Sequence, residues 1–323
     1  MRAAGAATIG HVAQIERIAD DLVVIDVHYN HTPQVISAYL LLGERPALIE
    51  SGPTSTVDTL LAGVREAGVD PRDLRAVAVT HIHLDHAGGA GTLARRFPQL
   101  EVYVHPAGAP HLIDPARLVA SAGRLYGDAL QRLFGDVAPV PEGQVKVLQD
   151  GESVLLGSRQ LVALDTPGHA NHHHAFWDPA SADLFTGDVA GVALPGSRYV
   201  RAPTPPPQLD LRAWDRSLAR LRALRPRRLL LTHFGPHTWV ADLLAQLEAR
   251  LQRNLQLVRE GLAAGESEDA ITGRLRAETL REIELRDGPG ASARYELIMP
   301  VWQSVTGLIR YVHTSEQEES RAP

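Results

Sequence analysis

Short apolar runs separated by amphipathic segments make up the first two thirds of the chain and restrict what it can fold into. Runs rich in Val, Ile and Leu and bounded by Gly, Pro or Asp are typical of buried strands. The predicted strands are 22–27, 36–41, 47–49, 74–79, 102–104, 146–148, 161–164, 175–177, 184–185 and 228–231. Apolar residues at helical spacing in 56–67 and 211–224 predict helices between them. The pattern therefore predicts an α/β fold.

After residue 231 the pattern becomes purely helical. Apolar side chains from Val240 to Val258 recur at helical spacing and predict one long amphipathic helix. Two more helices are predicted at 267–285 and 293–312. We therefore expect a catalytic domain at 11–236, a helical extension packed on it at 237–313, and flexible termini at 1–10 and 314–323. The extension either covers the active site or forms a homodimer through these helices.

Composition excludes several kinds of site and partner. The 323 residues include no cysteine, so disulfides and thiolate ligands are excluded and any metal must be bound by nitrogen and oxygen. A net charge of −6 argues against a nucleic-acid partner, which needs a basic face. No apolar run has membrane-spanning length, and residues 1–10 do not resemble a secretory signal. We expect a cytoplasmic protein that acts on a small molecule, without a membrane partner.

The strongest chemical signal directly follows the predicted strand at 74–79. Its sequence is Thr-His-Ile-His-Leu-Asp-His-Ala-Gly-Gly, residues 80–89. His81 and His83 alternate in an extended segment and can face one side, whereas Asp85 and His86 can turn toward a second point. One tetrahedral zinc ion with an open position cannot use four such side chains. The motif therefore predicts two neighbouring metal ions.

Further ligand-type side chains follow later strands. His169 comes after the turn Pro167-Gly168, Asp188 after Thr186-Gly187, and His233 after Thr232. Functional groups often lie on the loops at strand ends. Each side chain is thus a candidate ligand for the same pair of metal ions.

The order His-x-His-x-Asp-His, then Gly-His, Gly-Asp and a final His, resembles the metallo-β-lactamase superfamily over residues 36–236. The resemblance implies a four-layer αβ/βα sandwich with the metal ions at one edge, between two sheets. It also implies that His81, His83 and His169 bind the first ion. Asp85, His86 and His233 would bind the second, and Asp188 would bridge both. The expected cofactors are two zinc ions, with iron or manganese as alternatives.

The expected reaction follows from such a pair of ions. Two cations within about 4 Å lower the pKa of a shared water and yield a metal-bridging hydroxide at neutral pH. Asp85 is the expected catalytic residue, because it can orient the hydroxide or carry its proton. We expect a hydrolase that acts on an ester, lactone or thioester, and the intact Asp188 argues against a β-lactamase. Two alternatives stay open: a phosphodiesterase, and an oxidoreductase similar to sulfur dioxygenases, with one iron bound by His81, His169 and Asp188.

Several other residues are candidates for substrate contacts or for support of the ligands: Glu50, His105, His172, His173, Tyr199 and Arg201. Glu50 stands where the superfamily commonly has Asp before a Gly, and predicts a carboxylate that supports the ligands. His172, His173 and His174 enter a predicted strand and alternate in direction, so the favoured interpretation is that one packs or bonds locally and another is solvated. Tyr199 and Arg201 follow the expected bridging residue Asp188. They are either substrate contacts or an ordinary exposed pair of loop residues. His111, His237 and His313 are predicted at the surface and Trp302 in the core.

Overall fold

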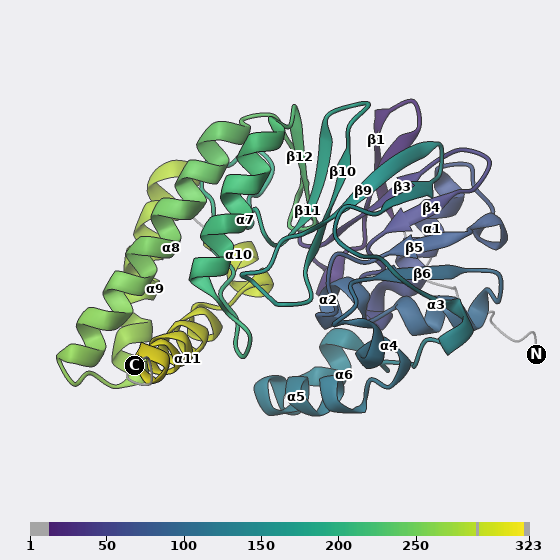
Figure 1. The fold of residues 1–323 in the computed structure, drawn as a ribbon. Coiled ribbons are helices and arrows are strands. Elements are labelled where there is room, and N and C mark those ends of the chain that lie inside the picture. The colour runs from purple at the N-terminus through teal and green to yellow at the C-terminus, as the bar shows by residue number, and fades with distance from the viewer. Residues whose placement is uncertain (1–12, 289–290, 320–323) are drawn as a thin grey trace, which may run out of the picture.

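Two β-sheets form the centre of the molecule (Figure 1). The computed structural model describes residues 13–288 and 291–319. The seven-stranded sheet has the order β1-β2-β3-β4-β5-β6-β7, antiparallel from β1 to β4 and parallel from β4 to β7. Its strands are β1 (Gln14–Ala19), β2 (Leu22–Asp26), β3 (Ser37–Leu41), β4 (Ala47–Ile49), β5 (Ala76–Ala78), β6 (Glu101–Val104) and β7 (Val145–Val147).

The second sheet has six strands in the order β13-β12-β11-β10-β9-β8, and only its β11–β12 pair is parallel within the described residues. Its strands are β8 (Ser153–Leu156), β9 (Arg159–Asp165), β10 (His174–Asp178), β11 (Asp183–Gly187), β12 (Arg228–Leu231) and β13 (Gly235–His237). Tyr39 of the first sheet meets Phe185 of the second edge to face, with ring centroids 5.2 Å apart. The two sheets therefore bury an apolar layer between them.

Helices cover the outer face of each sheet. On the first sheet lie α1 (Val57–Glu66) and α3 (Ala90–Arg96), whose apolar residues pack against Val77 and Val102. On the second lies α7 (Leu211–Leu224), whose Trp214 packs with Leu229 and Leu231. The arrangement confirms the four-layer αβ/βα sandwich, because a helix or sheet with one apolar face must bury it against another element.

Shorter helices lie in the connections of the sandwich. They are η1 (Tyr29–His31), η2 (Thr54–Thr56), η3 (Pro71–Asp73), α2 (Leu84–Ala87), α4 (Ala109–Ile113), α5 (Ala116–Tyr126), α6 (Ala129–Phe134) and η4 (Glu142–Gln144). None of the residues of α5 is fully buried. The pair α5 and α6 forms a layer at the foot of the molecule in Figure 1.

The C-terminal part is helical, as predicted: α8 (Val240–Ala263), α9 (Glu268–Asp287), α10 (Ser292–Ile298) and α11 (Val301–Glu319). The single helix predicted at 293–312 is wrong, because the chain leaves the helical conformation at Met299 (φ −142°, ψ 94°). Proline at position 300 disfavours a helical residue before it and lacks an N–H for the helix ladder. Residues 314–319 continue α11, so the predicted flexible C-terminus is helical there; residues 1–12 and 320–323 lie outside the described part.

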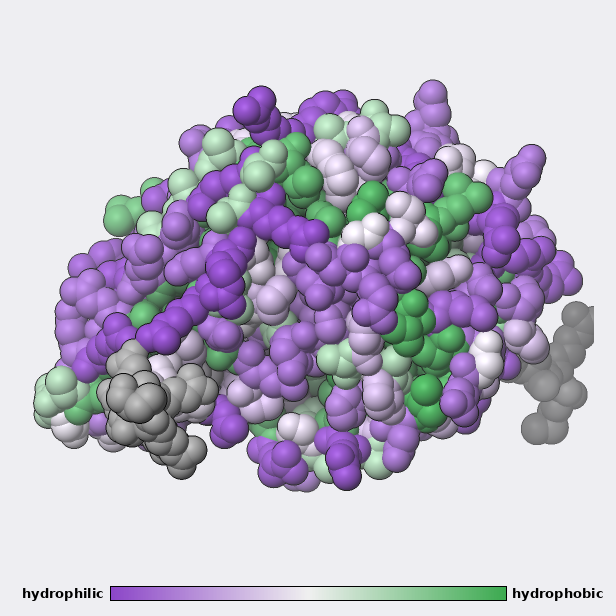
Figure 2. All heavy atoms as spheres, in the orientation of Figure 1, coloured by the Kyte–Doolittle hydropathy of each residue, from purple (hydrophilic) through white to green (hydrophobic). Residues whose placement is uncertain are grey.

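The extension packs on the second sheet and α7 through Leu243, Leu247 and Val305. On the face shown in Figure 2 its outer surface is mainly hydrophilic. No helix in the described part of the chain is both long and apolar enough to cross a lipid bilayer. Homodimer formation through these helices stays a prediction, as do the domain boundaries.

Candidate metal centre and adjoining cavity

All seven predicted ligand residues converge at one edge of the sandwich, where β5, β9, β11 and β12 end. The first two follow β5, the next two lie in α2, and the last three follow β9, β11 and β12: His81, His83, Asp85, His86, His169, Asp188 and His233. Positions 81 and 233 are 152 residues apart in sequence, so only the fold brings these donors together.

The donor atoms form two groups. In the first, the His83 Nδ1 lies 2.9 Å from the Nε2 of His81 and 2.9 Å from the Nε2 of His169. In the second, the Asp85 Oδ2 lies 3.7 Å from the Nε2 of His86 and 3.4 Å from the Nε2 of His233. Zinc–nitrogen bonds of about 2.0–2.1 Å put neighbouring donors of one tetrahedral ion about 3.3 Å apart. Both groups have the spacing of donors around one ion.

Asp188 connects the two groups. Its Oδ2 lies 3.4 Å from the Nε2 of His169, and its Oδ1 lies 3.3 Å from His86 and 3.6 Å from His233. The Oδ1 of Asp188 and the Nε2 of His86 are buried and have no hydrogen-bond partner among the described residues. Because a buried polar atom without a partner is costly, these atoms fit a divalent metal ion.

Hydrogen bonds on the outer side of the rings fix their tautomers. The Nδ1 atoms of His169, His233 and His86 donate to the carbonyl of Pro203 at 2.9 Å, to that of Val35 at 2.7 Å, and to the Glu50 carboxylate at 3.0 Å. The Nε2 lone pair of each ring is therefore left for the centre. Such outer partners orient metal ligands and raise their basicity.

Glu50 is fully buried beneath this centre, as expected of a supporting carboxylate. Besides the His86 ring, it accepts hydrogen bonds from the Thr80 backbone N–H at 3.2 Å and the Thr232 hydroxyl at 3.1 Å. Its side chain thus joins the segments that carry His81 and His233.

His173 contacts the backbone of Asp188 and so helps to fix its position. The His173 Nε2 accepts a hydrogen bond from the Asp188 backbone N–H at 3.2 Å, and its Nδ1 lies 2.8 Å from the Thr166 hydroxyl. His172 is also buried, and its ring centroid lies 5.5 Å from that of His83. Local packing describes both rings, but the expectation that one of the three consecutive histidines is solvated is wrong, because His172, His173 and His174 are all buried. A substrate contact for His172 or His173 stays a prediction.

Charges in the centre favour a cation. Burial raises the pKa of Asp85, but His86 and His233 outweigh it and lower that pKa to about 2. Burial and the His169 ring lower the pKa of His83 to about 3. Burial also lowers the pKa of His86, yet Asp188, Asp85 and Glu50 outweigh it and raise this pKa well above its usual value. The carboxylates that favour an extra proton on His86 also favour a divalent cation in the same place, because a metal ion displaces that proton when it binds the ring.

His105 does not reach these donors. Its Nε2 lies 3.3 Å from the Oδ1 of Asp165, and the same oxygen lies 2.8 Å from the Nε2 of His174. Because the His105 Nδ1 accepts a hydrogen bond from the Ala107 N–H at 3.0 Å, the neutral ring carries its proton on Nε2. The neutral His105 ring therefore directs its Nε2–H toward Asp165 and offers this cluster no lone pair for a metal ion.

Tyr199 and Arg201 are both buried, so their interpretation as an exposed loop pair is wrong. The Tyr199 ring packs edge to face on Tyr295, and the Arg201 Nη2 bonds Glu296 at 2.8 Å. Neither lines the cavity described below, and their role as substrate contacts stays a prediction. His237 is buried as well, and not at the surface, because its Nε2 bonds the Ala193 carbonyl at 2.9 Å.

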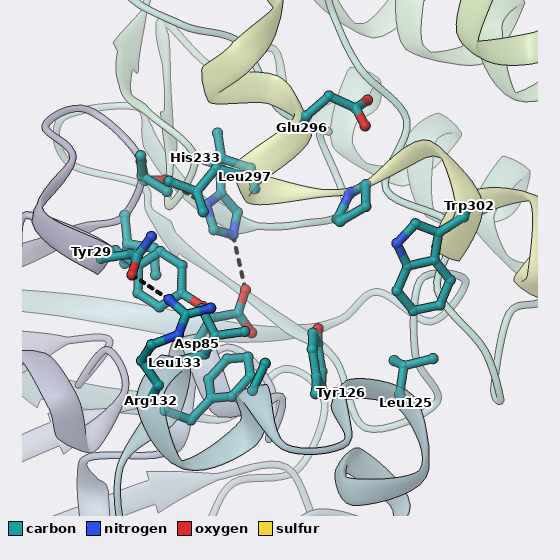
Figure 3. A pocket seen from close by; sticks show the side chains of 17 residues that line it. Tyr29, Asp85, Leu125, Tyr126, Arg132, Leu133, His233, Glu296, Leu297 and Trp302 are labelled. Carbon is teal, nitrogen blue, oxygen red and sulfur yellow. Dashed lines mark hydrogen bonds and ion pairs between the residues drawn. The ribbon is translucent and has the colours of Figure 1, made fainter.

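A cavity of about 290 Å³ opens beside the centre, and Asp85 and His233 form part of its wall (Figure 3). Asp85 has 26% of its side chain exposed, whereas the side chains of Asp188 and His233 are 3% and 2% exposed. In Figure 3, Tyr126 and Arg132 lie on one side of the cavity, and Glu296 and Leu297 lie on the other. Asp85 is thus the carboxylate of the centre that a bound molecule can reach.

Sequence reasoning missed most residues of this cavity. Its side chains come from η1, α5, α6, α10 and α11, and include Tyr29, Tyr126, Arg132, Phe134, Glu296 and Trp302. Trp302 was expected in the core but is 36% exposed and lines the cavity. The sequence offered one signal: aromatic residues make up only 5% of the chain, so each of them is a candidate for a shared site. Several of them meet at this cavity.

Comparison with known proteins agrees with this geometry. Residues 31–233 match the metallo-beta-lactamase superfamily. The chain is 27% identical over 207 residues to the metallo-beta-lactamase fold-containing protein ST1585 of Sulfurisphaera tokodaii, covering 63% of this chain and 74% of that protein. It is 33% identical over 194 residues to the hydroxyacylglutathione hydrolase of Methylococcus capsulatus, covering 59% of this chain and 60% of that enzyme.

Among solved structures, the metallo-beta-lactamase family protein TTHA1429 from Thermus thermophilus superposes with a TM-score of 0.69 at 21% identity. That match covers 93% of this chain and 95% of the other, so the fold is shared over nearly the whole length. The family match spans the segment that carries every donor of the centre. This chain therefore belongs to the metallo-beta-lactamase superfamily and is a metal-dependent hydrolase.

Proposed function

We propose that the chain binds two zinc ions and hydrolyses an ester, lactone or thioester. The observation that carries the proposal is that Asp188 directs one carboxylate oxygen to each of two donor groups. His81, His83 and His169 would hold one ion, and Asp85, His86 and His233 the other. When bound, the two ions would lower the pKa of a water molecule toward neutrality and polarise the substrate carbonyl.

Asp85 would act as the general base and then as the general acid of the reaction. It is ionised, borders the cavity and lies 3.4 Å from the His233 Nε2, which restricts its orientation. A carboxylate in this place can accept a proton from the attacking water and return it to the oxygen or sulfur of the leaving group. Most of the surrounding donors are almost fully buried (His81, His86, His169, Asp188 and His233), so the reacting atoms are in contact with little bulk water.

Two observations support a carbonyl substrate. The cavity is lined mainly by apolar and aromatic side chains, which suit an acyl group better than a polyanionic phosphodiester. Hydroxyacylglutathione hydrolases, named for a thioester substrate, are among the relatives, although the alignments span only about half of their length. Lys146 is the only lysine of the chain; it lies on β7 and pairs with Glu101 at 3.9 Å. It does not line the cavity, so a substrate bound there is contacted by no lysine.

Metal analysis combined with a substrate panel tests the proposal. We expect about two zinc ions per chain and turnover of at least one ester, lactone or thioester. One iron per chain without hydrolysis would favour the oxidoreductase similar to sulfur dioxygenases, and turnover of phosphodiesters alone would favour the phosphodiesterase.

Replacing the bridging carboxylate gives a sharper test. Asp188→Ala is expected to abolish hydrolysis and lower the zinc content, because both donor groups lose an oxygen. Asp242→Ala is the matched control, since Asp242 is an exposed residue in the first turn of α8. Circular dichroism checks that both variants fold, and unchanged turnover in Asp188→Ala would refute the bridging role.

A further inference from the structure

Arg132 is the charged residue of the cavity that is left without a counter-charge. It lies on α6, is exposed, and lines the cavity together with Leu133 and Phe134. Its Nη1 donates to the Asn30 side-chain oxygen at 2.8 Å, a neutral partner that holds the guanidinium in place. Among the described residues it forms no ion pair within 4.0 Å.

The other charged side chain outside the metal centre is already neutralised. Glu296 accepts from the Arg201 Nη2 at 2.8 Å and lies 3.5 Å from the Arg276 Nη2. Asp85 is the remaining carboxylate of the cavity wall, and it belongs to the donor set. Outside the donor set, the charge available to a bound molecule is therefore the positive charge of Arg132.

Arg132 lies close to the centre. Tyr29 directly precedes Asn30, the residue that Arg132 contacts, and it lines the cavity together with Asp85 and Arg132. Figure 3 shows Arg132 and Tyr29 on the same side of the cavity as Asp85, and Trp302 at the other end. A group that touches Arg132 can thus belong to a small molecule whose reacting bond lies at Asp85.

The rest of the wall selects an apolar body. Tyr126 packs edge to face on Phe134 with ring centroids 4.8 Å apart, and Phe134 in turn contacts Tyr29 at 6.1 Å. Leu297 and Trp302 face these rings across the cavity. Aromatic and aliphatic walls with one polar anchor are typical of sites for amphiphilic small molecules.

We propose that Arg132 determines specificity by binding an anionic group, such as a carboxylate, on an ester or thioester whose acyl part is aliphatic or aromatic. This inference rests on the proposed function, which it deepens by naming the substrate class. Arginine binds a carboxylate through two parallel N–H groups, and charge-assisted hydrogen bonds are about twice as strong as neutral ones. Asn30 is the positioning residue that aims the guanidinium.

A matched pair of substrates tests the proposal in the zinc-loaded protein. One is 4-nitrophenyl hydrogen glutarate, a monoanion at neutral pH, and the other is its neutral methyl ester. We expect kcat/KM to favour the monoanion by about tenfold or more, the size of one charge-assisted hydrogen bond. Arg132→Ala is expected to bring this ratio close to one, and Arg132→Glu to invert it. Arg124→Ala, an exposed arginine of α5 that does not line the cavity, should keep the wild-type ratio.

Binding of two dyes separates this inference from the proposed function. 8-Anilinonaphthalene-1-sulfonate is an aromatic anion, and N-phenyl-1-naphthylamine has the same rings without the sulfonate. Arg132→Ala should weaken the sulfonate dye about tenfold relative to the neutral dye, and Arg124→Ala should not. If neither ester is hydrolysed but the dyes discriminate as expected, the proposed function fails and the anion site remains. If Arg132→Ala changes neither the ester ratio nor the dye ratio, the role of Arg132 is overturned.

Discussion

At the scale of single residues, Glu50 holds together the segments that present the donors. Glu50→Gln keeps the shape of the side chain but removes its charge and places an amide N–H₂ among groups that donate to it: the Thr80 N–H, the Thr232 hydroxyl and the His86 ring. Loss of such an outer partner typically weakens metal binding about 10–100-fold. Chelator competition with zinc measures this change. Glu142→Gln, an exposed glutamate of η4, is the control, and equal affinities in the two variants would contradict the role of Glu50.

Among single residues, the positions of some could be predicted from the sequence and those of others could not. The donors were predictable because each follows a strand within a short motif, so local sequence determines where it lies. Glu50 was predictable from its place in that order. His237 and Trp302 were not, since their burial depends on partners far along the chain: Ala193 for His237, and the α5–α6 side of the cavity for Trp302. A residue's own neighbours in sequence carry no record of such contacts.

At the scale of elements, a buried ionic network connects the strands. Asp183 of β11 is fully buried and pairs with Arg159 of β9 at 3.1 Å and Arg228 of β12 at 2.6 Å. Arg159 also reaches Asp21, in the turn between β1 and β2, at 2.6 Å. The network therefore ties the two sheets to each other.

Asp183→Asn should destabilise the fold by about 3–5 kcal/mol, because it leaves the largely buried Arg159 and Arg228 short of one negative charge. Burial raises the pKa of Asp183, but Arg228 and Arg159 outweigh it and lower this pKa below its usual value. A carboxylate with a lowered pKa in the folded state contributes stability above its unfolded pKa of about 3.9 and loses it as the pH falls. Urea unfolding should therefore show a steeper loss of stability below about pH 4 in the wild type than in the variant. Parallel curves would contradict the pairing, and Asp128→Asn, at an exposed site, serves as control.

Elements with a strong local pattern were predictable, and those defined by pairing alone were not. The strand Ala47–Ile49 and the helix Leu211–Leu224 have the predicted bounds, because a continuous apolar run and a helical period mark them. The strands β1, β8 and β13 were missed. β1 has no fully buried residue, and β13 has the sequence Gly-Pro-His, which is typical of a turn. The strand conformation of β1, β8 and β13 comes from hydrogen bonds to β2, β9 and β12, respectively.

At the scale of the whole molecule, the helical extension supports the metal centre through a proline-rich loop, residues 202–208, which contains four prolines. The Pro203 carbonyl of this loop orients His169, and the next residue, Thr204, donates to the Ser304 carbonyl of α11 at 3.2 Å. Gly307 of α11 lies so close to the loop that an added Cβ would be 2.0 Å from the Thr204 carbonyl oxygen. The absence of a side chain at this position is therefore what lets α11 approach the loop.

Gly307→Ala should consequently disturb a donor that lies more than a hundred residues earlier in the chain. Since the contact is with backbone, either the loop or α11 must shift, and the Pro203 carbonyl moves away from the His169 ring. We expect zinc affinity to fall about 10–100-fold, as for the loss of any outer partner of a ligand, with a lower melting temperature. Gly273→Ala on α9 is the matched control, because a Cβ there meets nothing within 4 Å and alanine stabilises a helix interior by about 0.5–1 kcal/mol. Zinc affinity that is unchanged in Gly307→Ala, measured by the same chelator competition, would mean that the extension packs on the sandwich without supporting its metal centre.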